Sequence, residues 1–508
     1  MRRIGFKLLV GIALAGLVVV MPLRAGAPRF SWAISGGNSQ FDFLANLRVA
    51  PSGDLIASGE SANPLFPFPR PDGAVGFSDS GEFWLDLSPR GEIREGTVIT
   101  RNLMPSMDSD ASGRIFAAGT IQYPGFAWID STQYRSAVFA TNGAFVLAQY
   151  DSRRTLQWSR QFGNKDTSVL AFQIDAQTNL NAVGTFAAPI TFDSVTLTNV
   201  SSGQDQFVAQ FDAHGQTRWA RGGTSQNPPT QIIQDYSGNL IWCGNGAATF
   251  GSVVLPNGVG RLQQDFCLVK FTREGGVAWG RQSASPSPSV FVSAAAADRD
   301  GSIYVCGTLH PPGGSGSQFA TFDTTNVFVG NGSTFLAKFD RNGSFNWLTL
   351  LGLPWTNTPS ALHLAADPAG TCFVSTPDGL FKIGSNGQII WTRACPPHSL
   401  LAVDSSDRVF LAGERTNSVS FDDINLPYNG SNSLFIACLD GNRLQTSQSG
   451  NKAIITWPSG AAGVTLESSP TPSGPWTLAA HPPTGTGEDM VFTNADLSSP
   501  ALFFRLRD

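Results

Sequence analysis

The hydrophobic and polar residues of this chain follow a repeating pattern of short strands. Its clearest phrase is a turn, four or five apolar residues and a glycine, as in residues 52–59 (SGDLIASG) and 112–119 (SGRIFAAG). Short apolar runs between Gly, Asp and Asn turns predict β-strands, and no helical period accompanies them. The phrase occurs seven times, and its closing position holds Gly59, Gly119, Gly184, Gly244, Gly307, Ser375 and Gly413.

A second phrase follows most copies of the first. It consists of an alternating strand, an Asp/Gly turn and a strand that carries Trp, as in residues 207–219 and 335–347. Each unit of about 60 residues therefore holds four short strands, and residues 29–448 accommodate about seven units. Four antiparallel strands per repeat predict an all-β fold, a β-propeller of about seven four-stranded blades.

The two ends of the repeat region predict how the ring closes. A strand with Trp32, residues 30–34, precedes the first complete phrase, while the last unit ends near residues 434–440 without a Trp strand. We therefore expect the N-terminal strand to complete the last blade, which covers a sheet edge that would otherwise be exposed.

These units resemble the seven-bladed β-propeller repeats of secreted bacterial proteins, most clearly between residues 165 and 350. The resemblance covers residues 29–448, although the first unit lacks the Trp strand and the sixth is short. It implies a non-catalytic extracellular module and supplies no catalytic residues. The Trp pattern also resembles the repeats of quinone-dependent dehydrogenases, but no two Cys are adjacent here, so we interpret Trp as packing between blades.

The last sixty residues lose the repeat. Residues 449–508 alternate strands with Pro and Gly turns, and carry Trp457, a Pro-Trp pair ending at Trp476, and a Phe-Phe-Arg-Leu run at 503–506. This pattern predicts a small β-sandwich, and it resembles a fibronectin-like module found at the C-terminus of large secreted bacterial proteins. Attachment and sorting both remain open as its role.

The first 27 residues have the pattern of a signal peptide. Three basic residues precede the apolar run 8–20, and Ala25-Gly26-Ala27 has the form of a cleavage site. Thirteen apolar residues are fewer than the roughly 20 that span a bilayer. We therefore expect an exported protein, secreted or held at the cell envelope, with a propeller over 28–448 and no transmembrane segment in the mature chain.

Composition narrows the function further. Charged residues make up only 14% of the chain, which argues against a long coiled coil, and 41% hydrophobic residues argue against disorder. The net charge is −5 at pH 7, and it becomes more negative if the basic signal segment is removed. Nucleic-acid binding calls for a basic face, so we expect no nucleic-acid partner.

The residue types that carry chemistry are sparse. The six Cys lie mostly within apolar strands and fit small buried side chains, although one disulfide between Cys243 and Cys267 remains open. Asp298 and Asp300 resemble the start of a calcium loop, but the remaining ligands are missing. Asp before such turns fits local hydrogen bonding. We therefore predict no metal site, no cofactor and no catalytic residue.

One loop offers a candidate ligand platform. Residues 63–71 are rich in Pro and aromatic side chains, with Phe66, Phe68 and Arg70 as candidate ligand-binding residues. The same residues fit a cover over a blade equally well. Phrases such as Thr191-Phe192-Asp193 recur in the corresponding loops of other units, so we interpret those as structural.

The sequence thus favours an exported, non-enzymatic propeller that binds an unidentified glycan or protein outside the cytoplasm. The alternatives are a scaffold for assembly, a propeller enzyme that acts on polysaccharide, and a quinone-dependent dehydrogenase. An enzyme requires carboxylates or His from several loops to meet at one face, which the sequence alone does not test.

Overall fold

The fold is described here from a computed structural model. Within the described ranges every regular element is a strand, so no helix there is long and apolar enough to cross a membrane. The structure describes residues 10–11, 28–36, 42–50, 52–61, 68–70, 73–75, 81–101, 103–121, 126–129, 132–135, 144–153, 155–163, 166–256, 265–283, 289–310, 319–329, 332–351, 362–397, 399–404, 407–422, 424–428, 433–440, 445–449, 452–458, 465–469, 475–479, 484–486, 489–494 and 503–507.

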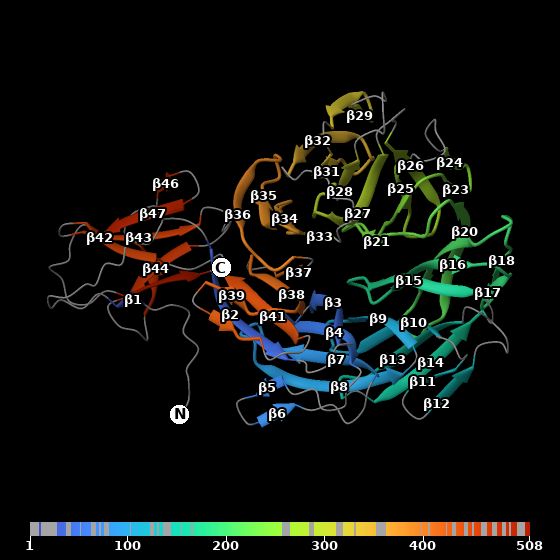
Figure 1. The fold of residues 1–508 in the computed structure, drawn as a ribbon, viewed down its shortest axis with the longest axis horizontal. Coiled ribbons are helices and arrows are strands. Elements are labelled where there is room, and N and C mark those ends of the chain that lie inside the picture. Colours follow the sequence, from blue (N-terminus) through green and yellow to red (C-terminus); the bar gives the residue numbers. More distant parts are fainter. Residues whose placement is uncertain are drawn as a thin grey trace.

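Seven four-stranded antiparallel blades form a ring, which confirms the predicted propeller and its blade number (Figure 1). From the inside outward, the first three blades are β3 (Phe43–Val49), β4 (Leu55–Ser61), β7 (Gly81–Leu87) and β8 (Ile93–Arg101); β9 (Leu103–Ser109), β10 (Ile115–Ile121), β13 (Phe145–Tyr150) and β14 (Leu156–Phe162); and β15 (Thr167–Ile174), β16 (Leu180–Phe186), β19 (Asp205–Phe211) and β20 (Thr217–Ser225).

The remaining blades follow the same order. Blades 4 and 5 are β21 (Gln231–Gln234), β22 (Leu240–Asn245), β25 (Phe266–Phe271) and β26 (Val277–Gln282), then β27 (Ser289–Ala297), β28 (Ile303–His310), β31 (Ser333–Phe339) and β32 (Phe345–Leu350). Blade 6 is β33 (His363–Ala366), β34 (Cys372–Thr376), β35 (Gly379–Ile383) and β36 (Ile389–Arg393). Blade 7 takes β37 (Leu400–Val403), β38 (Val409–Arg415) and β41 (Ser433–Asp440), and its outermost strand is β2 (Arg29–Gly36).

The ring closes as the sequence predicts. Strand β2 pairs antiparallel with β41, with Ala33 opposite Ala437. The innermost strands β37 and β3 contact each other, and Trp32 of the outermost strand β2 donates from Nε1 to the Pro89 carbonyl oxygen of blade 1 at 3.1 Å, so blade 7 meets blade 1 on both its inner and its outer side. The backbone groups at the outer edge of β41 are thereby paired rather than left exposed.

Each interface between blades has its own hydrophobic core. Seven clusters of buried apolar side chains lie between successive blades, one for each junction around the ring. The cluster between blades 2 and 3 holds a connected group of five Phe rings, including Phe145, Phe192 and Phe207. Because the two faces of a strand alternate, each blade supplies side chains to the cores on both of its sides.

The Trp strands join neighbouring blades, which confirms the packing interpretation. In the outermost strands, the rings of Trp32, Trp158, Trp219, Trp279 and Trp347 each lie on a turn glycine of the next blade: Gly91, Gly215, Gly275, Gly343 and Gly387. A Cβ on Gly275 would stand 2.5 Å from the Trp219 ring, and the φ angle of that glycine is +81°. Only glycine meets both conditions at low cost.

The glycine that closes the first phrase accommodates a bulge. In blades 1, 3 and 5 the innermost strand has an extra residue opposite this glycine, and that bulge turns a carbonyl toward it. A Cβ on Gly184 would lie 1.9 Å from the Ser168 carbonyl oxygen. In blade 6 the pairing of β33 with β34 is regular, so Ser375 fits where the other blades have glycine.

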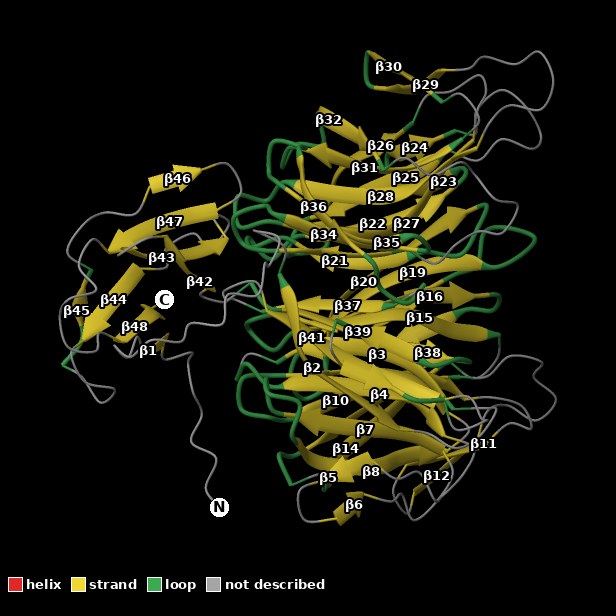
Figure 2. Cartoon of the chain, turned by 60° about the vertical axis from the view of Figure 1, so that its left-hand side comes forward, coloured by secondary structure: helices red, strands yellow, loops and turns green. Residues whose placement is uncertain are grey.

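Between the second and third strands, every blade except the sixth carries a short hairpin. They are β5 (Phe68–Arg70) with β6 (Gly73–Val75), β11 (Phe126–Ile129) with β12 (Thr132–Arg135), β17 (Ile190–Phe192) with β18 (Val195–Leu197), β23 (Ala248–Phe250) with β24 (Val253–Leu255), β29 (Phe319–Phe322) with β30 (Thr325–Phe328), and β39 (Val419–Phe421) with β40 (Ile424–Leu426). The β29–β30 hairpin stands out from its blade (Figure 2).

The recurring Phe-Asp phrase of these hairpins is structural, as predicted. Its Phe is buried, and its Asp turns the hairpin with a positive φ. The carboxylate then accepts the first N–H of an outermost strand, as Asp193 does from Thr217 at 2.7 Å and Asp323 from Phe345 at 2.7 Å.

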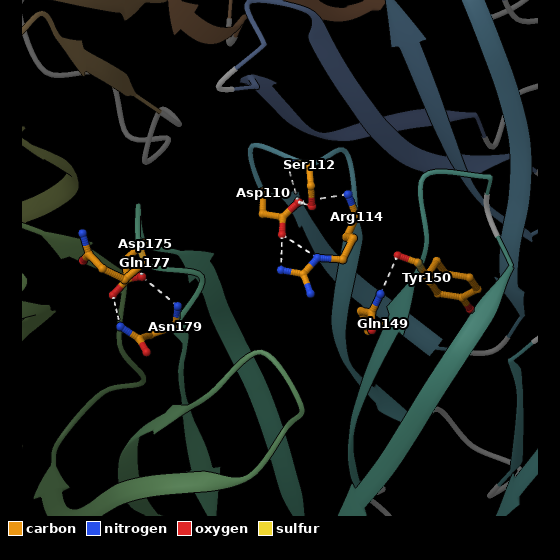
Figure 3. Close-up of polar contacts among 8 residues, drawn as sticks. All are labelled: Asp110, Ser112, Arg114, Gln149, Tyr150, Asp175, Gln177 and Asn179. Carbon is orange, nitrogen blue, oxygen red and sulfur yellow. Dashed lines mark hydrogen bonds and ion pairs between the residues drawn. The ribbon is translucent and has the colours of Figure 1, made fainter.

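The Asp before each inner turn makes the local hydrogen bonds that the sequence suggests. Asp110, Asp175, Asp235, Asp298, Asp367 and Asp404 each accept one or two backbone N–H groups of their own turn. Figure 3 shows the turns of Asp110 and Asp175. At the calcium-like turn, Asp298 also accepts the Tyr304 hydroxyl at 2.9 Å and pairs with Lys338. Its oxygens are therefore engaged by protein donors.

The open disulfide between Cys243 and Cys267 is absent, and all six thiols are free. The two Cys do lie on neighbouring strands, but Cys243 is opposite Leu268 and Cys267 is opposite Gly244. This offset of one residue turns the side chains to opposite faces of the blade, into different hydrophobic cores. Five of the six Cys are buried, in agreement with the prediction of small apolar side chains.

Strands beyond the propeller form two further four-stranded sheets. One contains β42 (Gln445–Ser449), β43 (Lys452–Pro458), β47 (Asp489–Asn494) and β46 (Thr484–Thr486); the other contains β1 (Val10–Gly11), β48 (Phe503–Arg507), β44 (Thr465–Ser469) and β45 (Thr477–Leu478).

Candidate functional site

The predicted ligand loop lies on blade 1, between its second and third strands. Phe66 falls outside the described residues, while Phe68 and Arg70 lie at the two ends of strand β5. Strand β5 pairs with β6, so this loop forms a hairpin like those of its neighbours. The side chains of the three candidates fall outside what the structure describes.

A cavity of about 390 Å³ lies on the same face of the ring, at the end of β4 and the start of β7, whereas strand β5 of the hairpin contacts the outermost strands β2 and β8. It lies among the innermost strands of blades 1, 2 and 3, at the same ends of the strands as the loop 62–80. Its wall is formed by Phe43, Ala45, Asn46, Gly59, Glu60, Glu82, Ser106, Met107, Ala118, Thr120, Ser168, Val169 and Leu170. Sequence reasoning did not identify this cavity, because its residues come from six strands of three blades.

Two carboxylates face each other in this cavity. Glu60, at the end of β4, is directly opposite Glu82, at the start of β7. Glu82 is only 6% exposed and Glu60 is half-buried. Their side chains therefore lie on the same face of the blade and bring two acceptor groups to one wall of the cavity. Both residues flank the loop that carries the predicted candidates.

The innermost strands supply the apolar part of the wall through their bulges. Ala45 and Leu170 are the extra residues of the bulges in β3 and β15, and both are exposed. Leu170 is 45% exposed and contributes apolar surface to the cavity wall. In blades 1 and 3 the marker glycines Gly59 and Gly184 therefore have a second effect: by permitting the bulge, they direct Ala45 and Leu170 to the cavity.

Two neutral polar side chains in the cavity have fixed orientations. The Asn46 amide donates from Nδ2 to the Met107 carbonyl oxygen at 2.7 Å, which leaves its Oδ1 as the acceptor. Thr120 Oγ1 accepts the Val169 N–H at 2.8 Å, so its hydroxyl hydrogen can be donated elsewhere. The cavity thus combines acceptors, one donor and apolar surface, which is the usual composition of a small-ligand site.

No cluster of three or more His, Cys, Asp or Glu able to hold a metal occurs within the described part of the chain. His214 and His310 lie on different blades, His214 in a turn of blade 3 and His310 at the end of β28. His310 packs on the Phe291 ring, with 4.5 Å between the ring centres, and burial lowers its pKa. In the cavity, the titratable groups are Glu60 and Glu82.

No protein-family model and no curated protein sequence matches the chain. Solved structures similar to it include the catalytically inactive virginiamycin B lyase from Staphylococcus aureus with quinupristin, which is 10% identical with a TM-score of 0.40 over 80% of this chain and 99% of that one. BamB from Moraxella catarrhalis is 14% identical with a TM-score of 0.33, covering 85% and 97%. The β-propeller domain of the Trilobed protease from Pyrococcus furiosus is 10% identical with a TM-score of 0.39, covering 79% and 94%. The blade number given above comes from the strand order of this chain.

Proposed function

We propose that this chain is an exported, non-enzymatic β-propeller that binds carbohydrate in the cavity of blades 1 to 3. The observation that supports this most is the opposed pair of carboxylates, Glu60 and Glu82, beside Phe43 and Leu170. Sugars present hydroxyl donors on one side and apolar C–H surface on the other. A pocket with paired acceptors and an aromatic ring complements both.

A second feature favours binding over turnover. Both carboxylates come from adjacent strands of one blade, and Asn46 and Thr120 are held by backbone contacts from neighbouring blades. Such rigid groups lose little freedom when a ligand binds. The loop 63–71 with Phe66, Phe68 and Arg70 begins three positions after Glu60, and its strand β5 contacts the outermost strands β2 and β8, so we propose that it adds ligand contacts outside the cavity.

The ends of the chain support the extracellular part of the proposal. The signal-peptide pattern of residues 1–27 implies export, and we propose that residues 449–508 form the fibronectin-like sandwich expected from the sequence. Ile455 and Phe492 are buried in one C-terminal sheet and Leu466 in the other, as two packed sheets require.

The test is binding of residues 28–508 to a panel of polysaccharides and their component sugars, with calcium and with a chelator. We expect saturable binding that survives chelation, with at least a tenfold loss in E82Q and in E60Q. The matched control is E92Q, which removes an exposed charge from the opposite face of the same blade and should stay within twofold of the unmodified protein. Failure to bind any sugar would contradict the proposal and favour a protein ligand.

The same carboxylates support a second candidate function, a propeller enzyme that cleaves polysaccharide. Glycoside hydrolysis uses two carboxyl groups on either side of the scissile bond, and Glu60 and Glu82 are the pair available in the cavity. Release of soluble sugar from a panel polysaccharide, lost in E82Q, would replace the binding proposal with this one. A quinone-dependent dehydrogenase has no specific support, because none of the six Cys is adjacent to another.

A further inference from the structure

A second cavity lies on the opposite face of the ring, between blades 3 and 4. It measures about 320 Å³ and is bordered by the inner turn of blade 3, with Asp175 and Asn179, and by Gln210, Trp219 and Arg273. These residues occupy the other ends of the strands from the Glu60 and Glu82 site, so the two cavities are separate.

The next junction of the ring shows what occupies this position elsewhere. Between blades 4 and 5, the ε-ammonium of Lys270 pairs with Asp235 at 2.7 Å and donates to the Arg341 carbonyl oxygen at 3.0 Å. It also lies 5.9 Å from the centre of the Trp279 ring. The ammonium is thus held by a carboxylate, a carbonyl and an aromatic face.

Blade 3 keeps this cradle and lacks the ammonium. In the repeat, Asp175 corresponds to Asp235, Arg273 to Arg341 and Trp219 to Trp279, while Gln210 stands where Lys270 does. The Gln210 amide donates to Asn181 at 2.9 Å. Asp175, Trp219 and Arg273, the three counterparts, all border the cavity.

The buried aspartates of the inner turns differ in whether a cationic side chain pairs with them. Asp110, Asp235, Asp298 and Asp404 each pair with a Lys or Arg. Asp175 is 7% exposed, and its hydrogen-bond donors in the described part of the chain are all neutral. They are the N–H groups of Gln177 and Asn179 and the Asn179 amide, in the turn drawn in Figure 3, and the Gln234 amide of blade 4. A buried carboxylate is stabilised far better by a cation than by neutral donors alone.

An unused acceptor lies beside this carboxylate. Asn179 is 9% exposed, and its Oδ1 is buried without a hydrogen-bond partner in the described structure. Its Nδ2 donates to Asp175 at 2.6 Å, and since a carboxylate only accepts, the amide orientation is fixed with the oxygen turned away from Asp175 (Figure 3). Leaving such an oxygen unpaired is costly, which makes the Asn179 side chain a strained neighbour of Asp175.

We propose that this cavity binds a primary ammonium group of a ligand, in the position that Lys270 fills at the next junction. Asp175 supplies the charge and Trp219 the aromatic face. The Arg273 carbonyl accepts the Trp219 indole N–H at 3.0 Å and has a second lone pair for an N–H group of the ligand. Asp235 accepts from its own turn and from Asn239 and still pairs with Lys270 through Oδ2, so hydrogen bonds within the turn leave room for an ammonium. At Asp175 the Gln234 amide donates to Oδ2 at 3.1 Å, so the ligand ammonium shares this oxygen with Gln234.

The charged residues at the mouth of the cavity disfavour a ligand with more than one positive group. Arg218 and Arg273 border it and are both exposed, and Arg273 pairs with exposed Glu274 at 3.5 Å. A second positive group on the ligand would meet these guanidinium groups, whereas a neutral or anionic group would not be repelled. The ligand is therefore a monoamine, such as a lysine side chain in a peptide or an amino sugar, rather than a polyamine.

The first test compares binding of n-butylammonium with that of its neutral counterpart n-butanol, by calorimetry on residues 28–508. We expect saturable binding of n-butylammonium at least tenfold tighter than that of n-butanol, and weaker binding of 1,4-diaminobutane. Equal affinity for the amine and the alcohol would overturn the proposal. Glucosamine and a lysine-containing peptide then distinguish the two sources of the ammonium.

Substitutions test whether n-butylammonium binds in the cavity between blades 3 and 4. Q210K restores the residue that the next blade uses, so its own ammonium should fill the cavity and abolish n-butylammonium binding without lowering the melting temperature. Q216K places the same charge at an exposed position of the same blade, outside the cavity, and should bind normally. D175N, which keeps the shape of the side chain, should lose the preference for the amine. Unchanged binding in both Q210K and D175N would contradict the assignment.

This inference does not depend on the carbohydrate proposal. Binding of n-butylammonium should be unaffected by E82Q, and sugar binding should be unaffected by Q210K, because the two sites lie on opposite faces. Loss of both activities in either variant would indicate unfolding, which the melting temperature of that variant reports.

Discussion

The backbone N–H of Phe30 donates to the Asp422 carboxylate at 2.8 Å, although 392 residues separate them. Asp193 and Asp323 make the same contact within blades 3 and 5, to residues that follow them in the chain. The N-terminal strand therefore takes the same position in blade 7 that the outermost strands take in blades 3 and 5. Asp422 also pairs with Arg393 of blade 6, which ties the closing strand to the preceding blade as well.

We predict that D422N weakens ring closure. The amide keeps the size of the side chain but removes the charge that Phe30 and Arg393 share, and the loss of charge-assisted bonds costs about 1–3 kcal/mol. Hydrogen exchange should show faster deuterium uptake in residues 29–36. The control D323N loses a corresponding backbone contact in blade 5 and should leave uptake in residues 29–36 unchanged. Equal uptake in the two variants would contradict the role of Asp422 in closure.

The bulge in blade 3 gives a second prediction. G184A places a methyl group 1.9 Å from the Ser168 carbonyl oxygen, so the bulge must shift. Overpacking of this kind costs about 1–3 kcal/mol, which urea unfolding measures. G203A, at an exposed glycine with nothing within 4 Å of the added methyl, should change stability by less than about 0.5 kcal/mol. Similar losses in both variants would mean that the bulge is not the cause.

Because the bulge also sets the position of Leu170, G184A should alter the blade 1 to 3 cavity as well. We expect weaker ligand binding there, with n-butylammonium binding at blades 3 and 4 retained.

Much of this fold could be predicted because the same sequence features recur in successive blades. The phrase that ends in Gly59 or Gly184, the turn aspartates and the Trp strands each recur, so blade number and closure followed from counting. The register of Cys243 against Cys267 could not be predicted, because an offset of one residue between strands leaves no mark on the spacing.

The candidate site was harder to predict for a related reason. Glu60 and Glu82 are 22 positions apart and meet only through the pairing of β4 with β7. Nothing in the composition of either strand marks them. The substitution of Gln210 for lysine was visible in the sequence, since Lys270 and Lys338 hold the corresponding positions, but it gained meaning only once Lys270 was seen to contact Asp235. The loop with Phe66, Phe68 and Arg70 stays a prediction.

Cysteine chemistry provides a third prediction. Since all six thiols are free, an Ellman titration in denaturant should count six per chain, and C243S and C267S should each leave the non-reducing mass of the protein unchanged apart from the substituted atoms. In the folded protein all should react slowly, because burial raises the pKa of Cys243 to about 12 and that of Cys395 to about 11. A count of four would show that a disulfide forms.

The turn of blade 2 makes a prediction about acid stability. Burial alone would raise the pKa of Asp110, but hydrogen bonds from Ser112 and Arg114 outweigh it and hold the pKa below its usual 3.8. A carboxyl with a lowered pKa in the folded state stabilises the fold above its unfolded pKa, and that contribution is lost as the pH falls through the folded value.

D110N should therefore be less stable than the unmodified protein at pH 7, and the difference should shrink as the pH falls below 3.8. Urea midpoints at pH 7, 5, 4 and 3 measure it. S112A removes one of the hydrogen bonds but keeps the ion pair with Arg114, so its stability at pH 7 should lie between those of the other two proteins. A difference between D110N and the unmodified protein that stays constant from pH 7 to 3 would mean that the Asp110 charge contributes nothing, and that the turn is held by its backbone hydrogen bonds alone.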